Sequence, residues 1–135
     1  MARILLMDDS DEIRALAARV LRSDGHTVAE AGNGKEGLRL LREVGADLVI
    51  TDIVMPEREG LETISEIRRT RPDLPIIAMS GGGAGTAGDY LSIAKALGAR
   101  RVLEKPFGVA QLIALVREVL GAPPPGGSSP TPSPP

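Results

Sequence analysis

The 135-residue sequence contains no cysteine and no tryptophan, and its only aromatic side chains are Tyr90 and Phe107. The lack of cysteine excludes disulfide bonds, thiolate metal sites and cysteine nucleophiles. Because 42% of the residues are apolar and almost none of them is aromatic, any hydrophobic core must be aliphatic. The length gives room for one domain of ordinary size with such a core.

An excess of charge and long apolar runs are lacking as well. The net charge of −2 offers no bulk attraction for nucleic acid, so direct nucleic-acid binding is not expected. The longest apolar runs have the length of strands, which excludes a membrane-spanning helix, and the N-terminus lacks the pattern of a signal peptide. We therefore expect a cytoplasmic protein that does not bind membranes.

Strand and helix patterns alternate five times along the chain. Strands separated by helices pair in parallel through right-handed crossovers. The third and fourth strands are continuous apolar runs, which indicates that helices cover both faces of the sheet. The sequence thus predicts an α/β fold with a doubly wound, five-stranded parallel sheet, whose strands span residues 3–7, 27–31, 47–51, 75–80 and 101–104.

Apolar residues at helical spacing define five helices between and after these strands. Asn33 has the pattern of an N-cap for the second helix, and glycines follow the first, second and fourth helices. The residues predicted to face inward are Ile13, Leu16, Ala17, Val20 and Leu21; Leu38, Leu41 and Val44; Leu61, Ile64 and Ile67; Tyr90, Ile93, Ala94 and Leu97; and Val109, Leu112, Ile113, Val116 and Leu120.

The composition changes abruptly at Gly121. Residues 121–135 consist only of Gly, Ala, Pro, Ser and Thr, which cannot form a core. We therefore predict a folded domain over residues 1–121 and a disordered Pro/Gly/Ser-rich tail over residues 122–135.

Reactive side chains stand at the carboxyl ends of four of the predicted strands. These are the pair Asp8 and Asp9, then Asp52, Ser80 and Lys105. In an open α/β sheet the carboxyl ends of parallel strands converge on one crevice, where ligands bind. An acidic cluster that faces one lysine and one hydroxyl is suited to a divalent cation and a phosphoryl group.

Each acidic residue of this set has an ordinary structural alternative. A lone aspartate at a strand end, such as Asp52, is often only a turn residue. The other three segments favour a carboxylate nucleophile that forms an acyl phosphate. Two adjacent carboxylates in a partly buried pocket need a cation, so Asp8 and Asp9 indicate Mg²⁺, whereas Asp11 fits a helix cap.

Lys105 and Ser80 supply the remaining groups of the predicted site. Lys105 can lie along apolar surface while its ammonium contacts phosphate, and the following Pro106 permits a cis peptide that aims the lysine. Ser80 can donate a hydrogen bond to a phosphoryl oxygen, but beside several glycines it can equally be a turn residue. Both interpretations of Ser80 remain open at this point.

Taken in order, these segments resemble the receiver (CheY-like) domain of two-component response regulators, and the resemblance covers residues 2–121. It implies a flavodoxin-like (βα)5 fold with strand order 2-1-3-4-5. It also implies a Mg²⁺ site formed by Asp8, Asp9, Asp52 and the backbone carbonyl of Val54. Asp52 would be the phosphoacceptor, with Ser80 as switch hydroxyl and Lys105 as phosphate contact. The segments that carry the resemblance are Met7-Asp8-Asp9, Thr51-Asp52, Met55-Pro56, Gly60, Ser80 and Lys105-Pro106-Phe107.

The resemblance further implies partners. A sensor histidine kinase or a histidine phosphotransfer protein would supply the phosphoryl group in a phosphorelay. The protein would be no enzyme in the usual sense, because it would catalyse only its own phosphorylation and dephosphorylation. With no recognisable output domain, we expect a single-domain response regulator whose fourth helix, fifth strand and fifth helix face a downstream protein. Candidates for the polar rim of this face are Lys95, Arg100, Arg101 and Glu104.

The sequence departs from the family pattern in three places. Val102 stands where the family often has an aromatic switch residue, and the glycine-rich loop 81–85 is longer than expected. Val54 and Gly82 cannot orient a water for hydrolysis, which predicts a persistent acyl phosphate.

Three other functions fit the sequence less well. Asp9-Ser10-Asp11 resembles the D-x-D motif of haloacid-dehalogenase-type phosphatases, but Ile13 departs from that motif and the late acidic pair is missing. A dinucleotide-binding module is disfavoured because the glycine-rich run follows the fourth strand rather than the first. A pseudo-receiver used only for docking is disfavoured by the complete set of site residues. The lone His26 is interpreted as structural.

Overall fold

The computed structural model describes residues 2–53, 59–81, 95–96 and 98–121. Within them, five strands form one parallel sheet in the order β2-β1-β3-β4-β5, as predicted. Most of the predicted fourth helix and of the glycine-rich loop, Val54 and the tail lie outside the described residues. The elements are β1 (Arg3–Met7), α1 (Asp11–Ser23), β2 (Thr27–Ala31), α2 (Gly34–Glu43), β3 (Leu48–Asp52), α3 (Glu59–Thr70), β4 (Ile76–Gly81), β5 (Arg101–Lys105) and α5 (Val109–Leu120).

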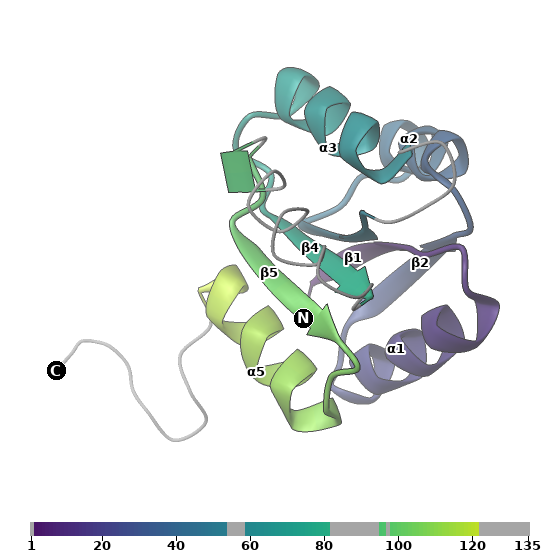
Figure 1. Cartoon of the computed structure of the whole chain (residues 1–135), viewed down its shortest axis with the longest axis vertical. Helices are drawn as coiled ribbons and strands as arrows, with labels where there is room; N and C mark the ends of the chain where they lie inside the picture. The colour runs from purple at the N-terminus through teal and green to yellow at the C-terminus, as the bar shows by residue number, and fades with distance from the viewer. Residues whose placement is uncertain (1, 54–58, 82–94, 97, 122–135) are drawn as a thin grey trace, which may run out of the picture.

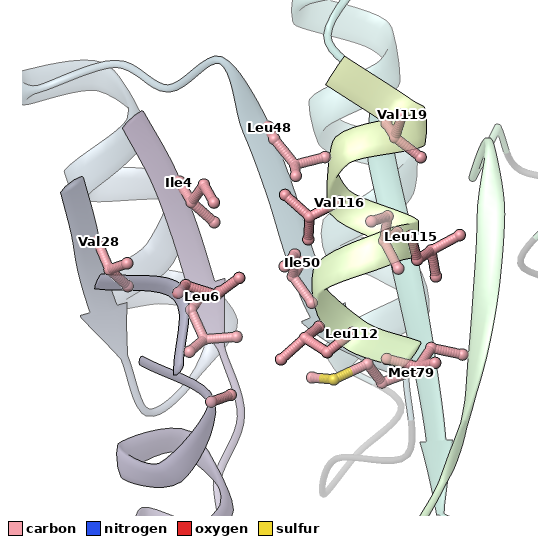
Figure 2. Packing of buried hydrophobic residues seen from close by; sticks show 14 of the residues in the cluster. Ile4, Leu6, Val28, Leu48, Ile50, Met79, Leu112, Leu115, Val116 and Val119 are labelled. Carbon is pink, nitrogen blue, oxygen red and sulfur yellow. The ribbon is translucent and has the colours of Figure 1, made fainter. Parts of the chain in front are cut away.

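Helices cover both faces of this sheet. α1 and α5 lie against one face, and α2 and α3 lie against the other (Figure 1). Alternate side chains of a strand point to opposite faces, so each strand contributes to two aliphatic cores. The core under α1 and α5 contains Ile4, Leu6, Leu48, Ile50, Met79, Leu112 and Val116 (Figure 2). The core under α2 and α3 contains Leu5, Met7, Val49, Ile64, Ile67, Ile76 and Ala78.

Three strands begin or end at different residues than predicted. β3 spans 48–52 instead of 47–51, β4 spans 76–81 instead of 75–80, and β5 continues to Lys105. The parallel pairing runs beyond the apolar stretches, because Asp52 pairs with Met79 and Lys105 pairs with Gly81. The sequence pattern detects where apolar residues stop, whereas the ladder of backbone hydrogen bonds continues into the polar residues that form the site.

Three apolar residues that were predicted to face inward are exposed. Leu16 and Val109 are each 54% exposed, and Val44 is 46% exposed. Leu16 lies at the edge of the buried stripe of α1, which Ala17, Ala18 and Leu21 occupy. Val44 is the C-cap residue of α2, so the helical spacing that would turn it inward ends before it. The helical periodicity therefore identified the buried faces but overestimated their width.

The sequence signals at the helix ends agree with the structure at α2 and differ from it at α1. Asn33 caps α2, and its side-chain oxygen accepts the N–H of Glu36 at 2.8 Å. The cap of α1 is Ser10 rather than Asp11, because the Ser10 hydroxyl accepts the N–H of Ile13 at 3.3 Å. Asp11 is the first helical residue, where its charge still favours the positive end of the helix dipole.

An ion pair joins α1 to α5 at the edge of the sheet opposite to the predicted site. The Arg117 guanidinium donates to both carboxylate oxygens of Asp24, at 3.1 and 2.6 Å. His26 lies beside this pair, with its Nε2 3.7 Å from the Asp24 carboxylate, while its Nδ1 accepts the N–H of Ala2 at 3.2 Å. These contacts support the structural role predicted for His26.

Replacing Asp24 is expected to reduce the loss of folding stability that the protein undergoes as the pH falls. The hydrogen bond from Arg117 outweighs burial and holds the pKa of Asp24 below its ordinary value of 3.8. Because the pKa of Asp24 is lower in the folded than in the unfolded protein, its carboxylate stabilises the folded state when the pH is above the ordinary pKa. This contribution is lost as the pH falls through the lowered pKa of the folded protein. The free energy of unfolding of Asp24→Asn should therefore lie below that of the wild type at pH 7 and converge on it in acid, as urea denaturation at a series of pH values would measure. A constant difference down to pH 2 would contradict this.

Gly37 allows α2 to approach the sheet closely. A methyl group on Gly37 would overlap the side chain of Met7, including its Cγ at 2.7 Å, and Met7 is fully buried. The close approach places the start of α2 against β1 on the face opposite to α1.

Among the described residues, no helix has the length and apolar character needed to cross a membrane.

Candidate functional site

Three of the predicted site residues extend the rows of apolar side chains that point toward α1 and α5. Along each strand, alternate residues share a face of the sheet. The row of Ile4 and Leu6 leads to Asp8, the row of Leu48 and Ile50 leads to Asp52, and Leu103 leads to Lys105. The inner residues of these rows belong to one core, so their last members emerge together at the carboxyl edge of β1, β3 and β5.

Lys105 joins the two buried carboxylates of the site. Its Nζ donates to Asp8 Oδ2 at 2.7 Å and to Asp52 Oδ2 at 3.0 Å. Asp8 is fully buried and Asp52 is 5% exposed, whereas Asp9 is exposed. One carboxylate oxygen from each of the three aspartates lies within 4.8 Å of the others. In the structure these four side chains therefore lie together, as the sequence predicts.

Burial and the two aspartates act in opposite directions on Lys105. Desolvation lowers the pKa of the Lys105 ammonium, but the hydrogen bonds and charges of Asp8 and Asp52 outweigh it, and the pKa lies above its ordinary value. The lysine is therefore a fixed positive charge at neutral pH. Three carboxylates against one ammonium leave the pocket with an excess of negative charge, which attracts a cation.

Ser80 lies on the strand beside Asp52 and is fully buried. The pairing of Asp52 with Met79 places Ser80 one residue further toward the carboxyl edge. Within the described part of the chain its hydroxyl has no hydrogen-bond partner. A buried hydroxyl without a partner is costly, so this donor fits a ligand oxygen better than a turn.

The donor set fits Mg²⁺. Mg²⁺ binds oxygen ligands and is usually held by one or two carboxylates together with waters and a phosphate oxygen. The carboxylates of Asp8, Asp9 and Asp52 provide such oxygens at mutual distances that one ion can bridge. The further ligand predicted from the resemblance, the Val54 carbonyl, lies outside the described residues.

One residue at this edge was missed by the sequence analysis. Arg14, on α1, donates from Nη1 to the backbone carbonyl of Asp8 at 2.6 Å and from Nη2 to Asp11 at 2.6 Å. An arginine three residues after an aspartate at the start of a helix indicates an ion pair on the helix surface. That spacing does not reveal the contact with the strand end.

Comparison with known proteins now decides the family. Residues 4–117 match the protein family described as the response regulator receiver domain. The chain belongs to this family. As a receiver domain it carries an aspartate phosphorylation site and is a phosphoacceptor rather than a true enzyme. This result excludes the haloacid-dehalogenase and dinucleotide-binding alternatives.

Curated relatives of this receiver domain are longer proteins. It is 38% identical over 121 residues to the sensor kinase CckA of Brucella abortus, covering 88% of this chain and 12% of that protein. It is 37% identical to the DNA-binding transcriptional regulator NtrC of Azospirillum brasilense, covering 90% and 24%. It is 36% identical to the response regulator MprA of Mycolicibacterium vanbaalenii, covering 87% and 50%. The chain thus spans half or less of the length of these relatives.

Solved structures agree with this assignment. The receiver domain of NtrX from Brucella abortus superposes with a TM-score of 0.81 at 32% identity, covering 87% of this chain and 98% of that one. The chemotaxis protein CheY4 of Vibrio cholerae superposes with a TM-score of 0.79 at 29% identity, covering 88% and 98%. The cis peptide that Pro106 was expected to permit is also present, between Lys105 and Pro106.

Two other features of this receiver domain can be compared with the predictions. Val102, at the position where an aromatic residue was expected, is partly buried and packs against the core under α2 and α3. Arg101, a candidate for the polar rim, forms an ion pair with Glu118 of α5. Arg101 is thus engaged within the chain rather than offered only to a partner.

Proposed function

We propose that this receiver domain accepts a phosphoryl group on Asp52 from a phosphohistidine of a sensor histidine kinase or a histidine phosphotransfer protein. The observation that carries the proposal is the position of Lys105, whose ammonium is 3.0 Å from Asp52 Oδ2 and 2.7 Å from Asp8 Oδ2. A lysine in this place neutralises charge that would otherwise repel an incoming phosphoryl group.

The chemistry is a transfer from nitrogen to a carboxylate oxygen. A carboxylate oxygen of Asp52 attacks phosphorus, the bond between phosphorus and the imidazole nitrogen breaks, and its electron pair stays on the imidazole. The product is an acyl phosphate that adds about −1.5 to −2 charges to the pocket. Lys105 and the Ser80 hydroxyl would contact its oxygens. Asp8, Asp9 and Asp52 would hold Mg²⁺, which supplies further neutralisation of the phosphoryl charge.

The phosphoryl group would act by shifting the equilibrium between two conformations. New contacts with Ser80 on β4 and Lys105 on β5 are made at the carboxyl ends of two adjacent strands. We propose that the downstream partner reads the face of the fourth helix, β5 and α5, of which β5 and α5 lie in the described part of the chain.

The test uses a small phosphodonor in place of the kinase. The protein is incubated with acetyl phosphate, with and without Mg²⁺, and its intact mass is measured. The proposal expects a gain of about 80 Da that requires Mg²⁺ and is lost on treatment with hydroxylamine, which cleaves acyl phosphates. A chain that gains no mass under these conditions, or a gain that resists hydroxylamine, would overturn the proposal.

The apolar groove between α1 and α5 suits the docking of a phosphodonor protein. It has a volume of about 220 Å³ and is lined by Arg19, Val20, Ser23, Asp24, Val109 and Ile113. Leu16 lies one turn before Val20 on the same helix, toward the start of α1, where the acidic edge lies. Leu16 and Val109 are two of the exposed large apolar residues of the described chain. The helix that forms one wall of this groove begins beside the acidic edge, and this favours the histidine donor as the occupant.

Leu16→Asp is expected to separate docking from chemistry. A charge in an apolar contact should slow phosphotransfer from a phosphorylated histidine donor about tenfold or more, because one buried apolar anchor contributes about 1.5–3 kcal/mol. Phosphorylation by acetyl phosphate should be unchanged. The matched control is Val44→Asp, which places the same charge on an exposed valine at the far end of α2. Equal slowing by both variants would contradict docking at this groove.

A further inference from the structure

Arg14 contacts three residues around the acidic pocket. Besides the Asp8 carbonyl and the Asp11 carboxylate, its Nε lies 3.4 Å from Glu30 Oε1 at the end of β2. Its side chain is only 17% exposed, and a methyl group on Gly32 would lie 3.5 Å from Nη1. The guanidinium is therefore enclosed between α1, the end of β1 and the loop after β2, in a position that its neighbours fix.

The peptide that Arg14 contacts is the one that joins Asp8 to Asp9. The Asp8 N–H donates to the Ala31 carbonyl at 3.1 Å, and the Asp8 carboxylate accepts from the Ser10 N–H and from Lys105. The Asp8 carbonyl accepts from Arg14. The orientation of that carbonyl sets the plane of the Asp8–Asp9 peptide and so the direction in which the Asp9 side chain leaves the backbone.

We propose that Arg14 is a positioning residue for the cation site. It would hold the Asp8–Asp9 peptide so that both carboxylates face the same ion. Asp9 is exposed, so packing does not orient its side chain, and the peptide is what remains to aim it. The inference rests on the proposed Mg²⁺ site and adds to it a residue that touches no metal ligand oxygen.

The sign of the effect distinguishes positioning from simple electrostatics. A positive charge near a cation site repels the cation, so removing that charge alone would strengthen Mg²⁺ binding. Loss of a group that orients a ligand weakens metal binding instead, typically by about 10–100-fold. The two roles of Arg14 therefore predict opposite changes in affinity.

The experiment is titration of the full chain with Mg²⁺ alone, followed by isothermal calorimetry. Arg14→Gln is expected to raise the Kd for Mg²⁺ about tenfold or more relative to the wild type. The control is Arg22→Gln, which removes an equal charge and also a partner of Glu30, 3.1 Å away, but makes no contact with Asp8. Its Kd should be unchanged or lower.

The outcomes are separable from those of the proposed function. If the wild type does not bind Mg²⁺, the proposed cation site itself is wrong. If the wild type binds and Arg14→Gln binds equally or more tightly, only the positioning role is overturned. Should Arg14→Gln not fold, Arg14→Lys replaces it. That variant keeps the charge and loses the planar fork, so weaker binding supports the proposal and unchanged or tighter binding overturns it.

Discussion

Asp52→Asn is expected to abolish the mass gain of about 80 Da that acetyl phosphate and Mg²⁺ produce in the wild type. The amide of asparagine is not a nucleophile at neutral pH, because its nitrogen lone pair is delocalised into the carbonyl. Asparagine keeps the size of aspartate and an oxygen that can accept the hydrogen bond from Lys105, so the fold is preserved. We expect no phosphorylated protein to be detectable by intact mass measurement of this variant.

The other aspartates of the pocket are poor alternatives as acceptors. Asp8 is fully buried, so its carboxylate, bound by the Ser10 N–H at 2.9 Å and by Lys105 at 2.7 Å, is the less accessible to a phosphodonor. Asp9 is exposed and is not in contact with the lysine. Asp52 is 5% exposed, lies beside the ammonium and stands on β3, the central strand of the sheet.

The control for Asp52→Asn is Asp73→Asn, which makes the same change at an exposed loop residue outside the pocket. It should be phosphorylated as the wild type is. Thermal unfolding of both variants checks that the fold persists. Phosphorylation of Asp52→Asn to the wild-type extent would show that another residue is the acceptor, and peptide mapping would then identify it.

The sequence was sufficient to place the main site residues because their positions follow from one topological rule. Asp8, Asp52 and Lys105 stand directly after apolar runs, and parallel strands bring such positions to one edge. Alternation of side chains then puts all of them on the same face. No knowledge of side-chain contacts was needed to predict that they meet.

Other features depend on tertiary contacts that no local pattern encodes. The contact of Arg14 with the Asp8 carbonyl depends on how α1 is set against β1, and its local spacing indicates only a pair with Asp11. Leu16 and Val109 fit the helical periodicity, yet they are exposed because Ala17, Ala18, Leu112 and Val116 already fill the narrow space beneath α1 and α5. The periodicity gives the direction of a helix face, while its buried width is set by the neighbouring elements.

Lys105→Met is expected to destabilise the protein strongly when Mg²⁺ is absent. Methionine replaces the aliphatic stem but removes the ammonium, so the fully buried Asp8 carboxylate loses its only cationic partner among the described residues. Breaking a buried ion pair by removal of one partner typically costs about 3–5 kcal/mol. Because the Lys105 side chain is itself 12% exposed, we expect a loss of about 3 kcal/mol in the free energy of unfolding at pH 7, near the lower end of that range.

The pH dependence of this difference has a definite sign. The pKa of Lys105 is raised in the folded state, so its contribution to stability is fully present below the ordinary value of 10.5 and is lost as the pH rises through the folded value. The gap between wild type and Lys105→Met, measured by urea denaturation, should be flat across neutral pH and narrow in strong alkali. The control is Lys35→Met, an exposed lysine of α2, whose unfolding free energy should match the wild type throughout.

Mg²⁺ should restore much of the stability that Lys105→Met loses. Without the ammonium, the pocket carries three carboxylates and binds a divalent cation more tightly than the wild type does. Binding to the folded state alone contributes about 2.7 kcal/mol when the free ligand is at 100 times its Kd.

The restored variant should still be phosphorylated far more slowly by acetyl phosphate, because a cation held by the carboxylates does not replace the lysine at the phosphoryl oxygens. Lys105→Met that is as stable as the wild type without Mg²⁺ would show that the ion pair contributes nothing to folding. Rapid phosphorylation of that variant would show that the lysine is not needed for the transfer.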